Sequence, residues 1–163
     1  MPIRIVSGGQ TGADRGALDA AIDLGLPCGG HAPLGWRAED GTIPDRYRTY
    51  LQQAATADWK ARTVLNIEHS DATLIFSQAR HLTGGSAFTQ AEAKRQGKPM
   101  RHVVLRGFSW EEVARVDFWV WIDAHQVRVL NVAGPRESKD PGIQRAVREA
   151  LSWLLAQGDG AAL

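Results

Sequence analysis

The sequence predicts an α/β fold in which a doubly wound, mainly parallel sheet of five strands carries helices on both faces. Short β-branched runs alternate along the chain with stretches of helical periodicity, which is typical of a parallel sheet. Two of the predicted strands lead into glycine-rich loops that are each followed by a helix. Because consecutive parallel strands need a crossover connection, usually a helix, this order favours parallel pairing.

The first strand is predicted over residues 3–6, where an Ile-Arg-Ile-Val run ends at a Ser-Gly-Gly turn. A helix follows, because apolar residues between positions 17 and 25 fall at the spacing of one helical face. Thr11 and Asp14 resemble a capping box at its start. A short strand over residues 27–30 completes the set of five.

Residues 31–57 show no periodic pattern and are rich in proline, glycine and charge. Structureless loops longer than ~12–15 residues are uncommon in compact domains and are usually functional or disordered. The segment is therefore either a loose surface insertion or a flap over a site. We favour the flap, because Trp36, Ile43 and Tyr47 offer apolar anchors to the body.

The middle of the chain continues the alternation of strands and helices. We predict helices over residues 58–70 and 87–96, strands over residues 72–76 and 101–105, and a further strand over residues 127–132. Residues 118–122 are strand-like in composition, but the spacing from Trp110 to Ala124 is helical, and a crossover is needed there, so we favour a helix.

The last helix carries the strongest boundary signals. Asp140 is the expected N-cap, Pro141 fits the first turn, and Gly158 marks the end. Its buried stripe is predicted to be Ile143, Val147, Ala150, Leu151, Leu154 and Leu155. We expect a single domain over residues 1–158, followed by a frayed tail over residues 159–163.

The charge balance and the short apolar runs of the chain argue against nucleic acid and membranes as partners. Nineteen basic and eighteen acidic residues give a net charge of +1, so no concentrated positive field directs the protein to nucleic acid or to a membrane. No apolar run approaches the ~20 residues that span a bilayer, and no secretory signal is visible. We expect a cytoplasmic protein. Cys28 is the single cysteine, and such a residue is more often a small buried hydrophobe than a nucleophile.

The loop over residues 7–14 lies between a strand and a helix N-terminus, where free N–H groups and the helix dipole favour an anion. No Gly-Lys-Ser/Thr follows, so it is not a Walker A loop. Its Gly8-Gly9-x-x-Gly12 spacing differs from the dinucleotide fingerprint, and no acidic residue ends the second strand, so NAD is not predicted. Alone, a tight turn without a ligand explains the loop equally well.

A second loop strengthens the anion interpretation. Residues 83–86, Thr-Gly-Gly-Ser, repeat the arrangement of strand, glycines and helix. If the strands over residues 3–6 and 72–76 are neighbours, both loops flank the crevice where α/β sheets bind ligands. A third loop over residues 131–139 shares that sheet edge, and its Arg136 and Lys139 are candidate phosphate contacts.

Metal and hydrolytic patterns are weak in this sequence. The five histidines are scattered, with no i,i+4 pair, and no cysteine pair exists, so no metal site is predicted. There is no Gly-x-Ser-x-Gly nucleophile elbow, and no catalytic residue is assigned.

Five segments together resemble the molybdenum carrier family: residues 5–14 (IVSGGQTGAD), 62–66 (RTVLN), 71–75 (DATLI), 83–86 (TGGS) and 130–138 (LNVAGPRES). The resemblance runs from about residue 3 to residue 155. It implies a homo-oligomeric (dimeric or tetrameric) Rossmann-like protein that holds molybdenum cofactor, a phosphorylated pterin dithiolene, with a molybdoenzyme as recipient. It also brings Arg62 and Asn66 into the site, although their spacing alone suits a solvated helix face.

That family is similar to the wider group of lysine-decarboxylase-like, or LOG, proteins and nucleotide-ligand sensors. The LOG motif Pro-Gly-Gly-x-Gly-Thr-x-x-Glu, laid on Gly84-Gly85, places its catalytic glutamate on Ala91. Glu92 is one residue out of register, about 100° around a helix. The phosphate-binding part is thus retained while the acid/base part is missing. The chain also lacks the glutamate that the resemblance leads us to expect near residues 51–53.

Three functions remain open from the sequence. The favoured one is a binding or carrier protein for a small phosphorylated or anionic ligand, such as molybdenum cofactor or a related pterin. The alternatives are an enzyme acting on nucleotides, with Asp14, Asp71 or Glu92 as its carboxylate, and a nucleotide-sensing module. The expected ligand-binding residues are Gly8, Gly9, Gln10, Thr11, Gly12, Asp14, Arg62, Asn66, Thr83, Gly84, Gly85, Ser86, Thr89, Asn131, Arg136, Ser138 and Lys139.

Overall fold

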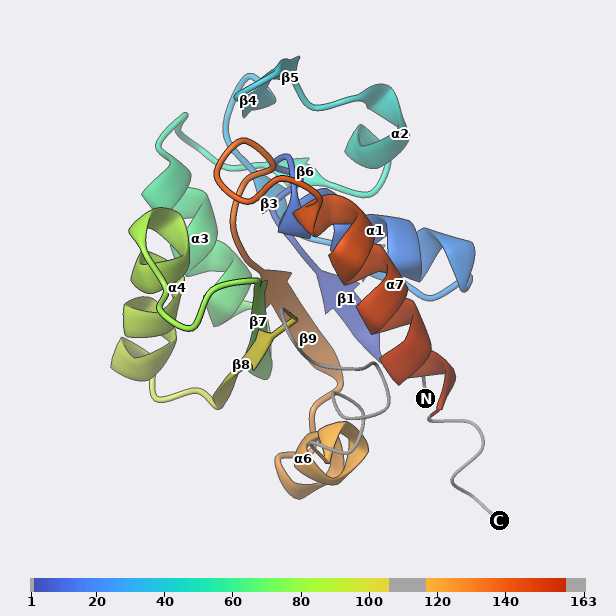
Figure 1. The fold of residues 1–163 in the computed structure, drawn as a ribbon. Coiled ribbons are helices and arrows are strands. Elements are labelled where there is room, and N and C mark those ends of the chain that lie inside the picture. Colours follow the sequence, from blue (N-terminus) through green and yellow to red (C-terminus); the bar gives the residue numbers. More distant parts are fainter. Residues whose placement is uncertain (1, 106–116, 158–163) are drawn as a thin grey trace.

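The structure is a computed structural model that describes residues 2–105 and 117–157. Its main sheet is all parallel and has the strand order β2-β1-β9-β7-β8 (Figure 1). The strands are β1 (Arg4–Val6), β2 (Cys28–Gly29), β7 (Ala72–Ser77), β8 (Met100–Val104) and β9 (Val129–Ala133). The predicted Rossmann-like α/β fold with five parallel strands is confirmed.

Helices cover both faces of this sheet. Helices α1 (Ala13–Asp23) and α7 (Ile143–Ala156) pack together on one side, and α3 (Trp59–Glu68) and α4 (Gly84–Arg95) pack together on the other (Figure 1). Right-handed crossovers that run in opposite directions from the middle of a sheet place their helices on opposite faces. The apolar stripe predicted for the last helix is buried throughout.

Strand β9 corrects one expectation about strand order. Strands β1 and β7 are not neighbours, because β9 lies between them and pairs with both. The register places Leu130 opposite Ile5 on one side and opposite Ala72 on the other. The loop that follows β9 therefore lies between the two glycine-rich loops, and all three meet at the carboxyl edge of the sheet.

The segment after β2 is ordered, which corrects the expectation of a structureless stretch. It contains β3 (His31–Ala32) paired with β6 (Gln52–Gln53), the hairpin β4 (Arg37–Ala38) and β5 (Gly41–Thr42), and the short helix α2 (Asp45–Arg48). Ile43 and Tyr47 are buried as predicted, while Trp36 is half-buried. Figure 1 shows this segment above the carboxyl ends of the strands.

Two predicted helix caps are wrong. Gly12, not Thr11, precedes α1, and no side chain caps it. Gly142, not Asp140, precedes α7. The carboxylate of Glu137 accepts hydrogen bonds there from the N–H groups of Gly142 (2.7 Å) and Gln144 (3.0 Å).

The ambiguous segment at 118–122 is helical, which confirms the prediction: α6 spans Phe118–Ala124 and lies at the opposite end of the sheet from the hairpin (Figure 1). The predicted start of that helix at Trp110, the helix end at Gly158 and the tail over residues 159–163 lie outside the described residues. Within residues 2–105 and 117–157, no helix has both the length and the apolar character that a bilayer crossing requires.

Candidate functional site

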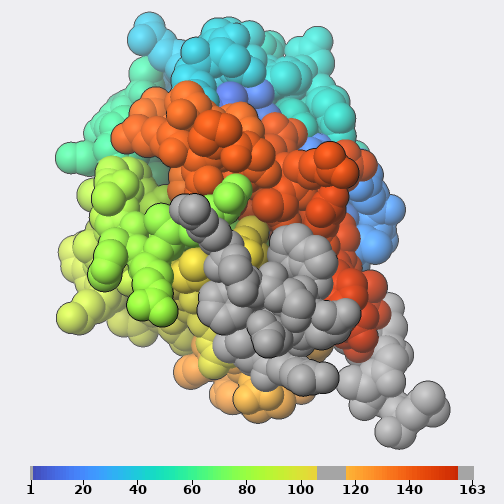
Figure 2. All heavy atoms as spheres, viewed as in Figure 1, coloured from blue at the N-terminus to red at the C-terminus, as the bar shows by residue number. Residues whose placement is uncertain are grey.

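A cavity of about 620 Å³ opens at the carboxyl edge of the sheet. This volume lies within the range of ~300–1,000 Å³ that is usual for small-molecule sites. Its walls come from the loops after β1, β7 and β9, from α3 and α4, and from the segment after β2. Figure 2 shows that segment and the loop after β9 next to each other on the surface at this end. The position is the one where open α/β sheets bind ligands.

The N-terminus of α4 faces this cavity. Thr83 precedes the helix without a side-chain cap, so the first N–H groups have no side-chain acceptor from it. Gly84, Gly85 and Ser86 all line the cavity. Lys139 from the loop after β9 lies above them, and a Cβ atom added to Gly84 would stand 3.1 Å from its Nζ atom. A helix N-terminus and an ammonium group therefore converge on one point, which favours an anion.

The N-terminus of α1 is closed instead. The N–H of Ala13 donates to the carbonyl of Pro135 (3.1 Å). At Gly12, where φ is +82°, an added Cβ would lie 2.6 Å from the backbone nitrogen of Glu137. The loop after β9 thus covers this helix end, and only Gln10 and Asp14 of the first loop line the cavity.

Asp14 and Arg62 form a buried pair in the cavity wall. The Nη1 atom of Arg62 lies 3.3 Å from Oδ2 of Asp14, which also accepts the N–H of Gln10 at 3.2 Å. Asp14 is 4% exposed, and its burial raises the pKa of its carboxyl. The positive charge of Arg62 lowers this pKa, but by less than burial raises it. The Nε atom of Arg62 is buried without a partner in the part of the chain that the structure describes.

The structure brings ten of the residues expected at the ligand to this cavity: Gln10, Asp14, Arg62, Thr83, Gly84, Gly85, Ser86, Thr89, Arg136 and Lys139. It places seven others outside the cavity wall: Gly8, Gly9, Thr11, Gly12, Asn66, Asn131 and Ser138.

Several of these seven hold the scaffold of the site. The amide of Asn66 pairs with the backbone of His31, at 2.7 Å and 3.0 Å. Asn131 donates to the hydroxyl of Thr73. With Gly8, both asparagines line a cavity of about 10 Å³ that also touches Asp14 and Arg62, next to the main one.

Sequence reasoning missed other residues of the cavity wall. Trp59, the first residue of α3, lines the cavity, although the sequence indicated only that it lies in the helix predicted over residues 58–70. Pro33, Arg37 and Ala38 reach it from the segment after β2, so that segment does form part of the site. The apolar anchors signalled this contact, but nothing local in the sequence shows which of its residues face inward.

The turn of the β4–β5 hairpin is hydrogen-bonded to two loops and to helix α1. Glu39 accepts hydrogen bonds from the hydroxyls of Thr11 and Ser138 and from the N–H of Ser138 (3.2 Å). Asp40 accepts two hydrogen bonds from Arg15, at 2.6 Å and 2.9 Å. The bonds from Ser138 and Thr11 lower the pKa of Glu39, and those from Arg15 lower the pKa of Asp40. The turn is thereby fastened to the loops after β1 and β9.

Acidification is expected to release this turn. The ordinary pKa values are 4.5 for Glu39 and 3.8 for Asp40, and folding lowers both. Each carboxylate therefore stabilises the fold fully at pH values above its ordinary pKa. This stabilisation is lost as the pH falls through the lower pKa of the folded protein. The protection of residues 37–42 from hydrogen exchange, taken relative to the intrinsic exchange rate at each pH, should therefore fall below about pH 4, before that of the central strands. Glu39→Gln should show faster exchange already at pH 7. Unchanged protection at pH 3 in a folded protein would contradict this assignment.

The other carboxylates considered for catalysis lie elsewhere. Asp71 accepts the N–H groups of Arg128 and Val129 at the start of β9, the opposite edge of the sheet. Glu92 is paired with Arg95 and Gln96, and the hydrogen bonds from Arg95 and then Gln96 lower its pKa to about 2. Of the three candidates, only Asp14 lines the cavity.

A serine and a histidine also meet at the cavity floor. The Oγ atom of Ser77 lies 2.6 Å from Nε2 of His102 and 2.7 Å from the carbonyl of Ala79. A carbonyl only accepts, so the single hydroxyl hydrogen goes to Ala79, and Nε2 of His102 must be the donor. This arrangement orients the loop after β7 and does not activate Ser77. Among the described residues, no group of three potential metal-ligating side chains is found.

An open parallel sheet with a ligand-sized cavity at its carboxyl edge defines a Rossmann-like ligand-binding protein. The chain belongs to the circularly permutated YpsA SLOG family, whose model matches residues 5–155. A crystal structure of a "Putative molybdenum carrier protein" from Syntrophus aciditrophicus SB is 44% identical, covers 94% of this chain and 95% of its own, and superposes with a TM-score of 0.88. These findings confirm the resemblance to the molybdenum carrier family. A search of curated proteins found no match.

Proposed function

We propose that this protein binds and carries a small phosphorylated ligand, molybdenum cofactor or a related phosphorylated pterin. The observation that carries the proposal is the uncapped N-terminus of α4 in a cavity wall with Lys139 directly above it. Arg62 and Arg136 add positive charge to the same cavity. The name of the 44% identical protein supports this class of ligand.

The cavity suits such a ligand in size and in polarity. Backbone N–H groups and Lys139 would take the phosphate, and Arg62 and Arg136 would take further anionic oxygens. A carrier also needs a recipient, for which we propose a molybdoenzyme in the cytoplasm. We further propose that residues 1–158 act as one ligand-binding domain within a homo-oligomer.

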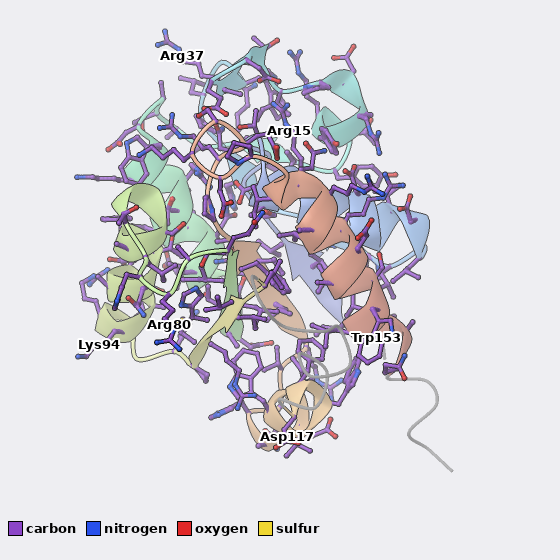
Figure 3. All side chains as sticks on the ribbon, viewed as in Figure 1. Arg15, Arg37, Arg80, Lys94, Asp117 and Trp153 are labelled. Carbon is purple, nitrogen blue, oxygen red and sulfur yellow. The ribbon has the colours of Figure 1, made fainter. Side chains whose placement is uncertain are left out.

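Thermal unfolding tests the proposal directly. A phosphorylated pterin at 100 times its dissociation constant should add ~2.7 kcal/mol to the free energy of unfolding. Lys139→Ala should weaken its binding about tenfold or more, because one charge-assisted hydrogen bond contributes ~1.5–3 kcal/mol. The control is Lys94→Ala, since Lys94 is exposed at the far end of the same helix (Figure 3). Phosphate, molybdate, tungstate and nucleoside monophosphates complete the series. Equal binding by both variants would place the anion elsewhere.

One observation favours a second function, an enzyme acting on nucleotides. Asp14 is a buried carboxylate in the cavity wall with a raised pKa, as a general acid or base requires. If nucleoside monophosphates alone stabilise the protein, turnover should be measured next. Turnover that is lost in Asp14→Ala would favour the enzyme over the carrier.

A further inference from the structure

The cavity wall contains a large aromatic side chain that the fold leaves partly exposed. Trp59 is 40% exposed and lines the cavity. Tyr50 is equally exposed but does not line it. An exposed tryptophan in the wall of a concave site is informative, because rigid aromatic surfaces commonly hold planar rings by stacking.

The indole ring packs against two neighbouring side chains. The ring of Phe88 packs edge-on against it, with ring centroids 5.3 Å apart and an angle of 77°. The ammonium group of Lys60 lies 5.6 Å from the centroid of Trp59 and 5.5 Å from that of Phe88. Asp58 fixes the start of this helix by accepting the N–H of Lys60. A surface that is already ordered before binding loses little entropy when a ligand stacks on it.

The ring also lies next to the N-terminus of α4. A Cβ atom added at Gly85 would stand 3.8 Å from Cζ3 of Trp59. Glycine at this position leaves no side chain between the indole and the first turn of the helix. An anion bound at that turn therefore has an aromatic surface immediately beside it.

We infer that Trp59 is a stacking platform for a planar heteroaromatic ring, and that the ligand carries its anionic group close to such a ring. This inference rests on the proposed function, because it takes the N-terminus of α4 as the anion site. It narrows the ligand class: a phosphorylated sugar or polyol without a ring system would use the anion site alone.

Two phosphorylated probes, one with a planar ring and one without, separate the contribution of stacking on Trp59 from that of anion binding. Binding of hydroxymethylpterin monophosphate and of glycerol phosphate is measured by calorimetry on the full chain. Trp59→Leu should weaken the pterin probe about five- to a hundredfold, the range found for stacking of one base on an aromatic side chain. It should change binding of glycerol phosphate less than twofold. Trp59→Phe keeps a ring and should lose less.

The matched control is Tyr50→Leu, which removes an equally exposed aromatic ring outside the cavity and should leave both affinities unchanged. An equal loss for both probes in Trp59→Leu, or no loss for the pterin probe, overturns the platform. If the wild-type protein binds both probes equally well, the stacking role of Trp59 is contradicted, but the anion site at the N-terminus of α4 is not. If it binds neither, the proposed function fails as well.

Discussion

Replacing Gly12 with alanine is expected to destabilise the protein by about 3–4 kcal/mol, from a strained backbone and a close overlap together. Gly12 has φ +82° and ψ −129°, a conformation that side chains rarely adopt. The added Cβ would also lie 2.6 Å from the backbone nitrogen of Glu137 and 2.8 Å from the carbonyl carbon of Arg136. Backbone atoms cannot rotate away as a side chain can. Urea unfolding measures the loss.

Gly25→Ala is the matched control. Gly25 has a similar φ of +65°, but an added Cβ meets nothing within 4 Å. Only the conformational cost remains, about 1–2 kcal/mol. If the two variants lose the same stability, the loop after β9 does not press on Gly12, and the N-terminus of α1 is open to ligands after all.

Replacing Arg15 with methionine is expected to cost about 2–4 kcal/mol and to loosen the β4–β5 hairpin. The side chain of Arg15 is 7% exposed. Its Nε atom donates to the carbonyl of Gly9 (3.0 Å), and its two terminal nitrogens bind Asp40. Figure 3 shows Arg15 between the body and the hairpin. The loss leaves a buried carbonyl without its donor, while Asp40 can return to water.

The control for Arg15 is Arg148→Met, which removes a surface ion pair with Asp23 and should barely change the urea midpoint. Limited proteolysis supplies a second readout. Arg15→Met should be cleaved within residues 37–42 faster than the wild type, whereas Arg148→Met should not. Loss of stability without faster cleavage would show that Arg15 stabilises the core and not the hairpin.

Much of the fold could be predicted because its signals are local. The apolar stripe of α7 and the glycine loops after β1 and β7 are read from neighbouring residues. Strand order is not local: nothing within residues 129–133 indicates that β9 pairs with both β1 and β7. The cap predicted for α7 failed because the carboxylate of Asp140 accepts the N–H of Gln78, from the loop after β7, and Glu137 takes its place at the helix.

The site was predictable to a similar extent. The second glycine loop, Arg136 and Lys139 line the cavity as expected from their place after parallel strands. The first loop has an equally good sequence pattern, but the carbonyl of Pro135, more than a hundred residues away, takes the N–H of Ala13. Trp59 escaped notice because periodicity assigns a residue to a helix face and cannot show what the face meets.

The position of β9 has a consequence for how the chain is made. Ile5 and Leu130 pair although they are about three quarters of the chain apart, and pairing so distant in sequence slows folding. During synthesis, β1 and β7 are made before β9, so each has an unpaired edge until β9 binds between them. Such edges invite association with other chains. We therefore expect the nascent chain to be prone to aggregation until residues 129–133 have been made, and the cavity to form only when β9 has paired with both strands.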